Sequence, residues 1–161
     1  GIRVPLLVRW PGVVKPASRC DVPVITVDFY PTLLEMAGAE RPSGQVLDGT
    51  SFLPLLRGAV DLGRQAIFWH FPAYLQGSGG TWRTTPAGAI RMGQWKLIEF
   101  FEDERIELYN IVRDISEKDN LAEKMPEKAK ELHELLMNWR RSVNAKVPTQ
   151  LNPRYDPKAG T

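Results

Sequence analysis

Three residues in the middle of the chain carry side chains that could bind a ligand. His70 lies in the aromatic run Phe68–Phe71, and Trp82 and Arg83 lie in a glycine-rich segment. An indole ring can stack on the apolar face of a sugar ring, and a guanidinium group can hold an anionic group with its N–H donors. We therefore predict that Trp82 and Arg83 contact a bound ligand, and that His70, an imidazole in an aromatic run, could do so as well.

Each of these residues could instead have a purely structural role. A histidine in an aromatic cluster can hydrogen-bond within the protein, and residues of a glycine-rich loop can simply be solvated. Residues 75–88 show no sustained periodicity and are expected to form a long loop. Such loops on compact domains are often functional or mobile, so both interpretations stay open.

The composition limits the classes of protein that fit. The chain has 161 residues, 43% hydrophobic and 25% charged, which is typical of a soluble globular domain. The net charge is +2 and the basic residues form no stripe, so we expect no nucleic-acid partner. No apolar run is long enough to span a bilayer. The first residue is Gly1 rather than Met, which suggests a fragment or a processed product.

Residue types that bind metal ions are sparse. Cys20 is the single cysteine and there are two histidines, so neither an internal disulfide nor a structural zinc site is expected. Asp114, Glu117 and Asp119 form an acidic cluster, but it lacks the central glycine and the ligand spacing of an EF-hand. We interpret that cluster as a solvated acidic loop and predict no metal site.

The second half of the chain predicts a small antiparallel sheet covered by a long helix. Four runs rich in β-branched and aromatic residues should form the strands: residues 66–71, 89–92, 95–100 and 106–110. Apolar and polar residues alternate in the last two, which is typical of a sheet with one wet face. Arg91 and Lys96 are expected to line that outer face rather than to act as catalysts.

The helix should begin near Pro126 and bury one apolar stripe. The stripe follows helical spacing and consists of Ala129, Leu132, Leu135, Leu136, Trp139 and Val143. The residues expected to face water are Lys128, Lys130, Glu131, Glu134 and Arg140. His133, on the flank of the helix, is expected to be an ordinary surface residue.

The first half of the chain predicts fewer elements. Residues 4–8 form an apolar run typical of a strand buried in a parallel sheet. Residues 26–37 should form a helix that starts at Thr26 or Asp28 and ends at Gly38. Its apolar face, which we expect to pack, consists of Val27, Tyr30, Leu33, Leu34 and Ala37. A short helix is expected within residues 51–56, with Pro54 in its first turn.

Five blocks in this order and spacing resemble the C-terminal portion of a known enzyme family. They are GIRVPL to WPG (residues 1–12), VDFYPTLL to Gly38, LDGTSFLPLL (residues 47–56), AIRMGQWKL (residues 89–97) and ELYN with its acidic loop (residues 107–122). Together they resemble sulfatases of the arylsulfatase or N-acetylgalactosamine-6-sulfatase type, in the alkaline-phosphatase-like superfamily.

The resemblance implies an α/β fold that becomes α+β in its C-terminal part. Residues 1–62 would be the end of the large catalytic α/β sandwich. Residues 63–143 would be a subdomain with a four-stranded antiparallel sheet packed against a long helix, and residues 144–161 an extended tail. Residues 1–62 alone would expose apolar surface, so self-association of the chain is expected.

The resemblance also implies an activity. Sulfatases of this kind hydrolyse sulfate esters, here of sulfated sugars such as N-acetylgalactosamine 6-sulfate, with a formylglycine and a calcium ion. Cys20 stands in RCDVP, which does not match the cysteine signature from which formylglycine is made, and the family's metal motif is absent. We therefore predict no catalytic residue and no cofactor in this chain. A missing N-terminal catalytic domain would supply both. The family is usually periplasmic, secreted or lysosomal.

Two other functions compete with this one. The aromatic residues beside the glycine-rich loop would also suit a non-catalytic module that binds a glycan or a partner chain. A phosphate-ester hydrolase of the same superfamily is the further alternative, although the LDGTSF and QWKL blocks favour a sulfatase.

Overall fold

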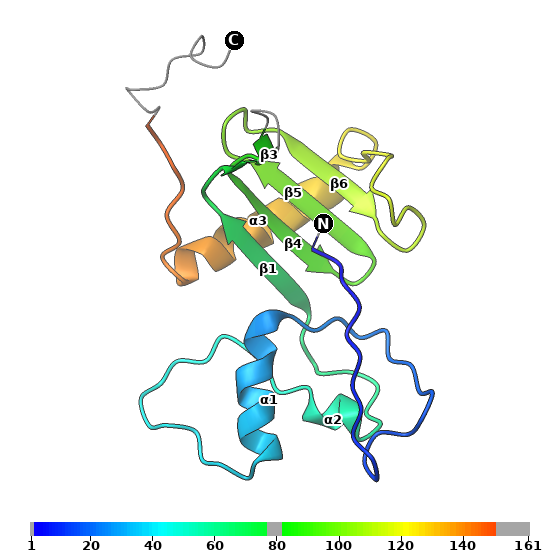
Figure 1. Cartoon of the computed structure of the whole chain (residues 1–161). Helices are drawn as coiled ribbons and strands as arrows, with labels where there is room; N and C mark the ends of the chain where they lie inside the picture. Colours follow the sequence, from blue (N-terminus) through cyan, green and yellow to red (C-terminus); the bar gives the residue numbers. More distant parts are fainter. Residues whose placement is uncertain (1, 77–81, 151–161) are drawn as a thin grey trace. The chain divides into compact units, whose positions relative to one another are not determined.

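The computed structural model describes residues 2–76 and 82–150 (Figure 1). The chain divides into two compact units, Gly1–Arg64 and Gln65–Thr161, called here the N-terminal and the C-terminal unit. Within the described residues, no helix has the length and apolar character that crossing a bilayer requires.

The C-terminal unit is built on a four-stranded antiparallel sheet in the order β1-β4-β5-β6 (Figure 1). Its strands are β1 (Ala66–Phe71), β4 (Ala87–Met92), β5 (Trp95–Phe100) and β6 (Ile106–Asn110). The predicted sheet is therefore confirmed, with β4 beginning earlier than residue 89. Gly93 forms the tight β4–β5 turn with a φ of 56°, a conformation that costs glycine little.

One face of this sheet is covered by helix α3 (Pro126–Ser142), as Figure 1 shows. Pro126 occupies the first turn, where its missing N–H breaks no helical hydrogen bond. Ile90, Leu97, Leu108, Leu132 and Leu136 are all 0% exposed and form the core between the sheet and the helix. The predicted packing of the long helix on the dry face of the sheet is confirmed.

The exposure of three residues in and just after α3 differs from the prediction, most clearly at Arg140. Arg140, expected in water, is 6% exposed and pairs with Glu99 of β5. It lies four residues after Leu136 on the same helical stripe, so its stem is buried while its guanidinium reaches a carboxylate. Leu135 and Val143, expected in the stripe, are 37% and 48% exposed, because one lies at its rim and the other beyond the helix end.

His133 is also more than a surface residue. Its side chain is 26% exposed, and Nε2 lies 3.2 Å from Oε1 of Glu99. The approach has the distance of an ion pair without the geometry of a good hydrogen bond. Glu99 therefore faces two basic side chains of α3, Arg140 and His133, and this cluster joins the helix to β5.

The predicted loop over residues 75–88 contains regular structure. Leu75–Gln76 (β2) pairs antiparallel with Trp82–Thr84 (β3), and β4 begins at Ala87. The expectation of a structureless loop was wrong at these positions, because backbone pairing and an aromatic contact across the ribbon stabilise a local fold. Residues 77–81 of the predicted loop, and residues 151–161 of the predicted tail, lie outside the described residues.

The N-terminal unit contains helices only among its described residues. The 3-10 turn η1 (Thr26–Asp28) continues into α1 (Phe29–Met36), and α2 spans Leu53–Leu56, so both predicted helices are confirmed. The strand expected over residues 4–8 is absent from residues 2–64. A strand needs a neighbour to pair its backbone groups, and no other strand occurs in those residues. Val4 and Leu7 are accordingly 78% and 93% exposed.

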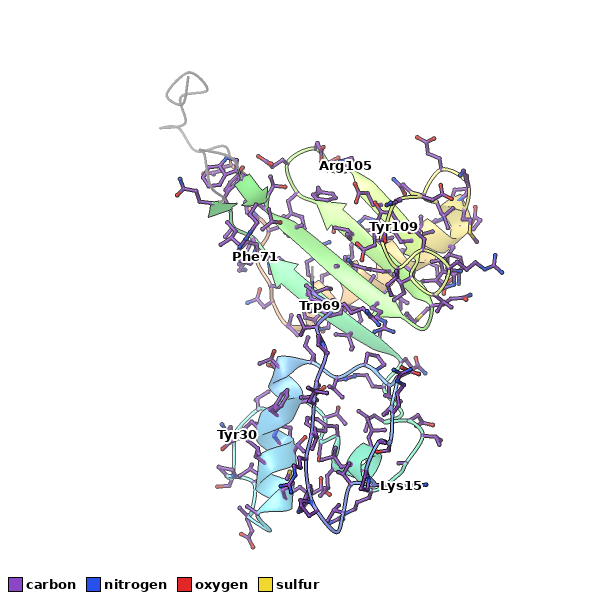
Figure 2. The ribbon with its side chains drawn as sticks, turned by 45° about the vertical axis from the view of Figure 1, so that its right-hand side comes forward. Lys15, Tyr30, Trp69, Phe71, Arg105 and Tyr109 are labelled. Carbon is purple, nitrogen blue, oxygen red and sulfur yellow. The ribbon has the colours of Figure 1, made fainter. Side chains whose placement is uncertain are left out.

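The apolar face of α1 is not covered as predicted. Val27, Tyr30 and Leu33 are 47%, 43% and 57% exposed, and Figure 2 shows Tyr30 extending outward from the helix. The buried residue of α1 is instead Thr32. Exposed apolar residues of this kind are typical of a surface that contacts another protein surface.

A polar cluster around Asp28 organises this unit. Asp28 is 0% exposed, and its carboxylate accepts hydrogen bonds from Arg64 at 2.7 and 2.8 Å. The amides of Ile25 and Thr50 donate to the same carboxylate at 2.8 and 2.9 Å. Burial acts to raise the pKa of Asp28, but the Arg64 and backbone donors outweigh it and lower the pKa.

The chain passes very close to this cluster at Gly49. A side-chain Cβ at this position would lie 2.0 Å from the carbonyl oxygen of Val27, so only glycine fits. Beside it, the Thr32 hydroxyl donates to the Asp28 carbonyl at 2.6 Å and accepts from the Phe52 amide at 3.0 Å. The second and third sequence blocks are thus brought together by polar contacts and close backbone packing.

Candidate functional site

His70 lies near the end of β1, opposite Gly88 of β4. Its Nε2 is 2.8 Å from the carbonyl oxygen of Lys146, and its ring centroid is 5.5 Å from that of Phe101. Because a carbonyl can only accept, Nε2 carries the proton and donates. His70 therefore holds the segment that follows α3, as the structural alternative expected. A substrate contact by His70 stays a prediction.

Trp82 and Arg83 lie on β3 at the surface. The Trp82 side chain is 54% exposed, and its ring centroid is 4.9 Å from that of Tyr74 at an interplanar angle of 49°. Arg83 is exposed beside it in sequence, and no ion pair of Arg83 occurs among the described residues. An open indole face and an available guanidinium are what binding a sugar and an anion would require.

Tyr74 is the residue of this surface that the sequence prediction missed. It is 46% exposed and contacts Trp82 through its ring. Its hydroxyl donates a hydrogen bond to the carboxylate of Glu102. The signal available in the sequence was an aromatic residue just before the glycine-rich segment, close to Trp82 along the chain.

The three predicted residues fall into two groups. Trp82 and Arg83 are neighbours on β3 and share the ribbon with Tyr74. His70 contacts Phe101 and Lys146, and no contact among the described residues joins it to Trp82 or Arg83. The geometry thus assembles an aromatic pair with an adjacent arginine, while His70 belongs to a separate structural contact.

The sheet face opposite α3 is less wet than the sequence suggested. Lys96 of β5 is 8% exposed, and its Nζ lies 2.7 Å from both carboxylate oxygens of Glu117. Lys96 lies on the outer face, as expected, and joins the acidic loop to the sheet. Trp69 and Phe71 extend from β1, the edge strand of the sheet (Figure 2).

The acidic loop is internally paired rather than simply solvated. The carboxylate of Asp114 accepts from the amides of Asp119 and Lys118 at 2.9 and 2.7 Å, and these backbone donors lower its pKa. Glu117 pairs with Lys96, and Asp119 pairs with Lys124 at 2.9 Å. Across the described residues, no three histidine, cysteine or acidic side chains are grouped to hold a metal ion.

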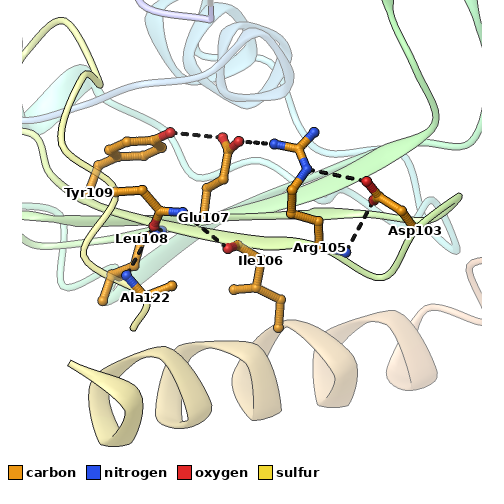
Figure 3. Close-up of polar contacts among 8 residues, drawn as sticks. Asp103, Arg105, Ile106, Glu107, Leu108, Tyr109 and Ala122 are labelled. Atoms are coloured by element: carbon orange, nitrogen blue, oxygen red, sulfur yellow. Dashed lines mark hydrogen bonds and ion pairs between the residues drawn. The ribbon is translucent and has the colours of Figure 1, made fainter. Parts of the chain in front are cut away.

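A second polar network runs along β6 and the turn before it (Figure 3). The Tyr109 hydroxyl donates to Glu107 at 2.9 Å, and Glu107 pairs with Arg105. Arg105 also pairs with Asp103 at 3.3 Å and covers the ring of Phe100 at 3.9 Å. Burial and the adjacent Glu107 carboxylate raise the pKa of Tyr109, so the phenol stays protonated near neutrality. This network is suited to support, not to proton transfer.

Comparison with known protein families identifies the family to which this chain belongs. A family described as N-sulphoglucosamine sulphohydrolase, C-terminal, matches residues 1–142. The chain belongs to this family of C-terminal sulfatase regions. A sulfatase of Formosa agariphila is 40% identical over 136 residues, which cover 78% of this chain and 24% of that protein.

Other relatives give the same result. Arylsulfatase K of Danio rerio is 33% identical over 136 residues, covering 83% of this chain and 25% of its own length. The chain thus spans about a quarter of the length of these two relatives.

Solved structures agree with the sequence relatives. One, in complex with its substrate D-glucosamine-2-N,6-O-disulfate, matches 89% of this chain and 29% of its own with a TM-score of 0.69 and 27% identity. Another, Ps i-CgsB in complex with k-i-k-neocarrahexaose, matches 88% of this chain and 29% of its own with a TM-score of 0.65 and 28% identity. The expected fold, the C-terminal part of the alkaline-phosphatase-like architecture, is confirmed.

Proposed function

We propose that this chain is the C-terminal part of an enzyme that hydrolyses sulfate esters of sugars, and that it supplies support and substrate contacts rather than the reacting groups. The observation that carries this proposal is the family match over residues 1–142. The chain spans about a quarter of the length of two sulfatase relatives, which supports a role as one part of a larger enzyme.

The substrate class that we propose is a sulfated hexosamine, with N-acetylgalactosamine 6-sulfate as the first candidate. A structural relative has D-glucosamine-2-N,6-O-disulfate as its substrate, which supports a 6-O-sulfated amino sugar. Galactosamine and glucosamine differ only at one ring hydroxyl, so both sulfates belong in the same assay.

The groups that perform the hydrolysis are proposed to lie in an N-terminal catalytic domain. There, a formylglycine hydrate would supply the nucleophile and a calcium ion would bind the sulfate oxygens. The residues described here do not fit either group. Cys20 is exposed outside any matching signature, and Asp114, Glu117 and Asp119 are engaged by amides and lysines. We therefore expect this chain alone to be inactive.

Within the complete enzyme, we propose that Trp82, Arg83 and His70 contribute to substrate binding. The exposed Trp82 and Arg83 support this role directly. His70 would contribute through the position of the segment around Lys146, to which it donates. A periplasmic, secreted or lysosomal location is proposed from the family alone.

The test compares the complete protein with this chain on matched substrates. The complete protein should release sulfate from N-acetylgalactosamine 6-sulfate or N-acetylglucosamine 6-sulfate and leave the corresponding 6-phosphates intact. This chain should release no sulfate from either. Preference for the phosphate esters would favour the phosphate-ester hydrolase, and sulfate release by this chain alone would contradict the assigned division of roles.

A non-catalytic glycan-binding module is the second candidate, and the exposed Tyr74–Trp82 pair favours it. A complete protein that binds a sulfated sugar without hydrolysing it would select this candidate.

We also propose that the isolated chain self-associates, because Val27, Tyr30 and Leu33 expose one apolar face. Light scattering that shows only monomers at micromolar concentration would exclude this.

A further inference from the structure

We propose that Tyr74, Trp82 and Arg83 form a preorganised subsite that binds one ring of a sulfated oligosaccharide, and that it does so in this chain without the hydrolytic centre. The proposal deepens the proposed function and rests on it for the identity of the sugar as substrate. It adds Tyr74 as a contact residue and Glu102 as the residue that positions it.

The aromatic pair offers a platform of suitable size and exposure. Tyr74 and Trp82 are 46% and 54% exposed although their rings are in contact at 4.9 Å. Two large aromatic side chains that touch each other and still face water keep much of their π surface available. The C–H groups on one face of a pyranose ring pack well on such a surface, whereas a charged or hydroxyl-rich edge does not.

The platform is held in place by contacts on both sides. The backbone register pairs Gln76 with Trp82 and Leu75 with Thr84, which fixes the β2–β3 ribbon next to Tyr74. The Tyr74 hydroxyl donates to Glu102, which lies 28 residues further along the chain in the β5–β6 turn. Because the ring is held from two directions, little conformational entropy is lost when a ligand binds.

Arg83 gives the platform its preference for an anion. Its guanidinium is exposed and forms no ion pair within residues 2–76 and 82–150. A guanidinium can hold two oxygens of a sulfate ester at once, which a hydroxyl group cannot match. The carboxylate of Glu102 accepts a hydrogen bond from the Tyr74 hydroxyl. The charge and the apolar surface together fit a sulfated sugar.

The experiment titrates the whole 161-residue chain with a 6-O-sulfated galactosaminoglycan tetrasaccharide and, separately, with the same tetrasaccharide after desulfation. The readout is the indole N–H signal of Trp82, resolved from the other four tryptophans by nuclear magnetic resonance. The sulfated probe should shift this signal saturably at up to millimolar concentration, and the desulfated probe should bind more weakly.

The variants separate the parts of the subsite. Tyr74→Ala and Trp82→Ala should each weaken binding about fivefold to tenfold, and Trp82→Tyr should restore most of the affinity. Binding by Trp82→Ala is followed by calorimetry, since the signal is lost. Arg83→Ala should weaken binding of the sulfated probe about twofold to fivefold at low salt and leave the desulfated probe unaffected. Tyr30→Ala and Arg113→Ala, at exposed positions elsewhere, are the matched controls.

Glu102→Gln tests the positioning role, because it keeps the size of the side chain and removes its charge. It should weaken binding less than Tyr74→Ala does and leave the backbone signals of the sheet unchanged. Absence of binding at millimolar concentration, equal affinity for both probes, or indifference to Tyr74→Ala and Trp82→Ala would each overturn the subsite. The complete enzyme separates this from the proposed function: hydrolysis with an unchanged KM in Trp82→Ala would refute the subsite and keep the sulfatase.

Discussion

The two units of the chain are stabilised in opposite ways. The C-terminal unit has a dry core of leucine and isoleucine side chains between its sheet and α3, and the polar clusters lie around that core. The N-terminal unit buries a charged pair at its centre, Asp28 with Arg64, and exposes apolar side chains such as Val4 and Leu7. The first arrangement is that of a self-sufficient fold. Exposed apolar side chains, as in the second, are typical of a surface that contacts another protein surface.

This difference matches the separate roles proposed for the two units. In the C-terminal unit, the β2–β3 ribbon bears Trp82 and Arg83, and Tyr74 lies just before it in the chain. In the N-terminal unit, the Asp28 cluster fixes the path of three segments and leaves the apolar face of α1 open. In the function proposed above, the C-terminal unit contacts the ligand and the N-terminal unit offers a surface for packing.

The largest effect is expected at the polar centre of the N-terminal unit. Asp28→Ala leaves the half-buried Arg64 without its partner and removes the acceptor of two backbone amides, which should cost about 3–5 kcal/mol of unfolding free energy. Urea unfolding followed at the backbone amides of α1 measures this cost. Asp48→Ala, at an exposed position of the same unit, should change little. Equal effects of the two variants would refute the central role of Asp28.

In the C-terminal unit, the largest effect should come from an apolar residue. Leu132→Ala removes a fully buried side chain between α3 and the sheet and should cost about 2–5 kcal/mol of unfolding free energy. Leu135→Ala is the control, because Leu135 lies on the same helix but is 37% exposed, and should cost much less. Urea unfolding followed at the β5 amides distinguishes them. A large effect of Leu135→Ala would place the core elsewhere.

A smaller effect is expected at the ionic contact between α3 and β5. Burial acts to raise the pKa of Glu99, but His133 and Arg140 outweigh it and lower the pKa below its ordinary value. Because the folded state binds the proton less well than the unfolded state, this carboxylate stabilises the fold above its ordinary pKa, and the contribution is lost as the pH falls.

Glu99→Gln should therefore lower the unfolding free energy of the C-terminal unit by about 1–3 kcal/mol near neutral pH and by less in acid, which urea unfolding at several pH values measures. Glu134→Gln, at an exposed position of α3, is the control and should change the unfolding free energy little at any of these pH values. A cost of Glu99→Gln that does not shrink in acid would contradict the role assigned to its charge.

The local patterns of the sequence predicted most of the C-terminal unit. Strands β5 and β6 follow from alternation, and α3 follows from Pro126 and an apolar stripe. The burial of Arg140 could not be predicted in this way, because its partner Glu99 lies 41 residues earlier and no local pattern joins them. The prediction of a strand over residues 4–8 was wrong because an apolar run alone does not make a strand. A strand also requires a neighbouring strand that pairs its backbone groups.

The candidate site could be predicted only in part, because some of its contacts join residues that only the fold brings together. Trp82 and Arg83 are recognisable by residue type and by their glycine-rich surroundings. Tyr74 acquires its role only through its ring contact with Trp82 and its hydrogen bond to Glu102, both of which depend on the fold. His70 has the residue type of a ligand contact, but the structure gives it a carbonyl partner at Lys146.

The most direct test of the contrast between the units is amide hydrogen exchange on the 161-residue chain at neutral pH. The account predicts the slowest exchange in β4, β5 and α3, and intermediate protection at the amides of Ile25 and Thr50. It predicts little protection over residues 2–20, where the apolar side chains are exposed. Protection over residues 2–20 equal to that of β4 and β5 would contradict it, because it would show that the N-terminal unit folds around a core of its own.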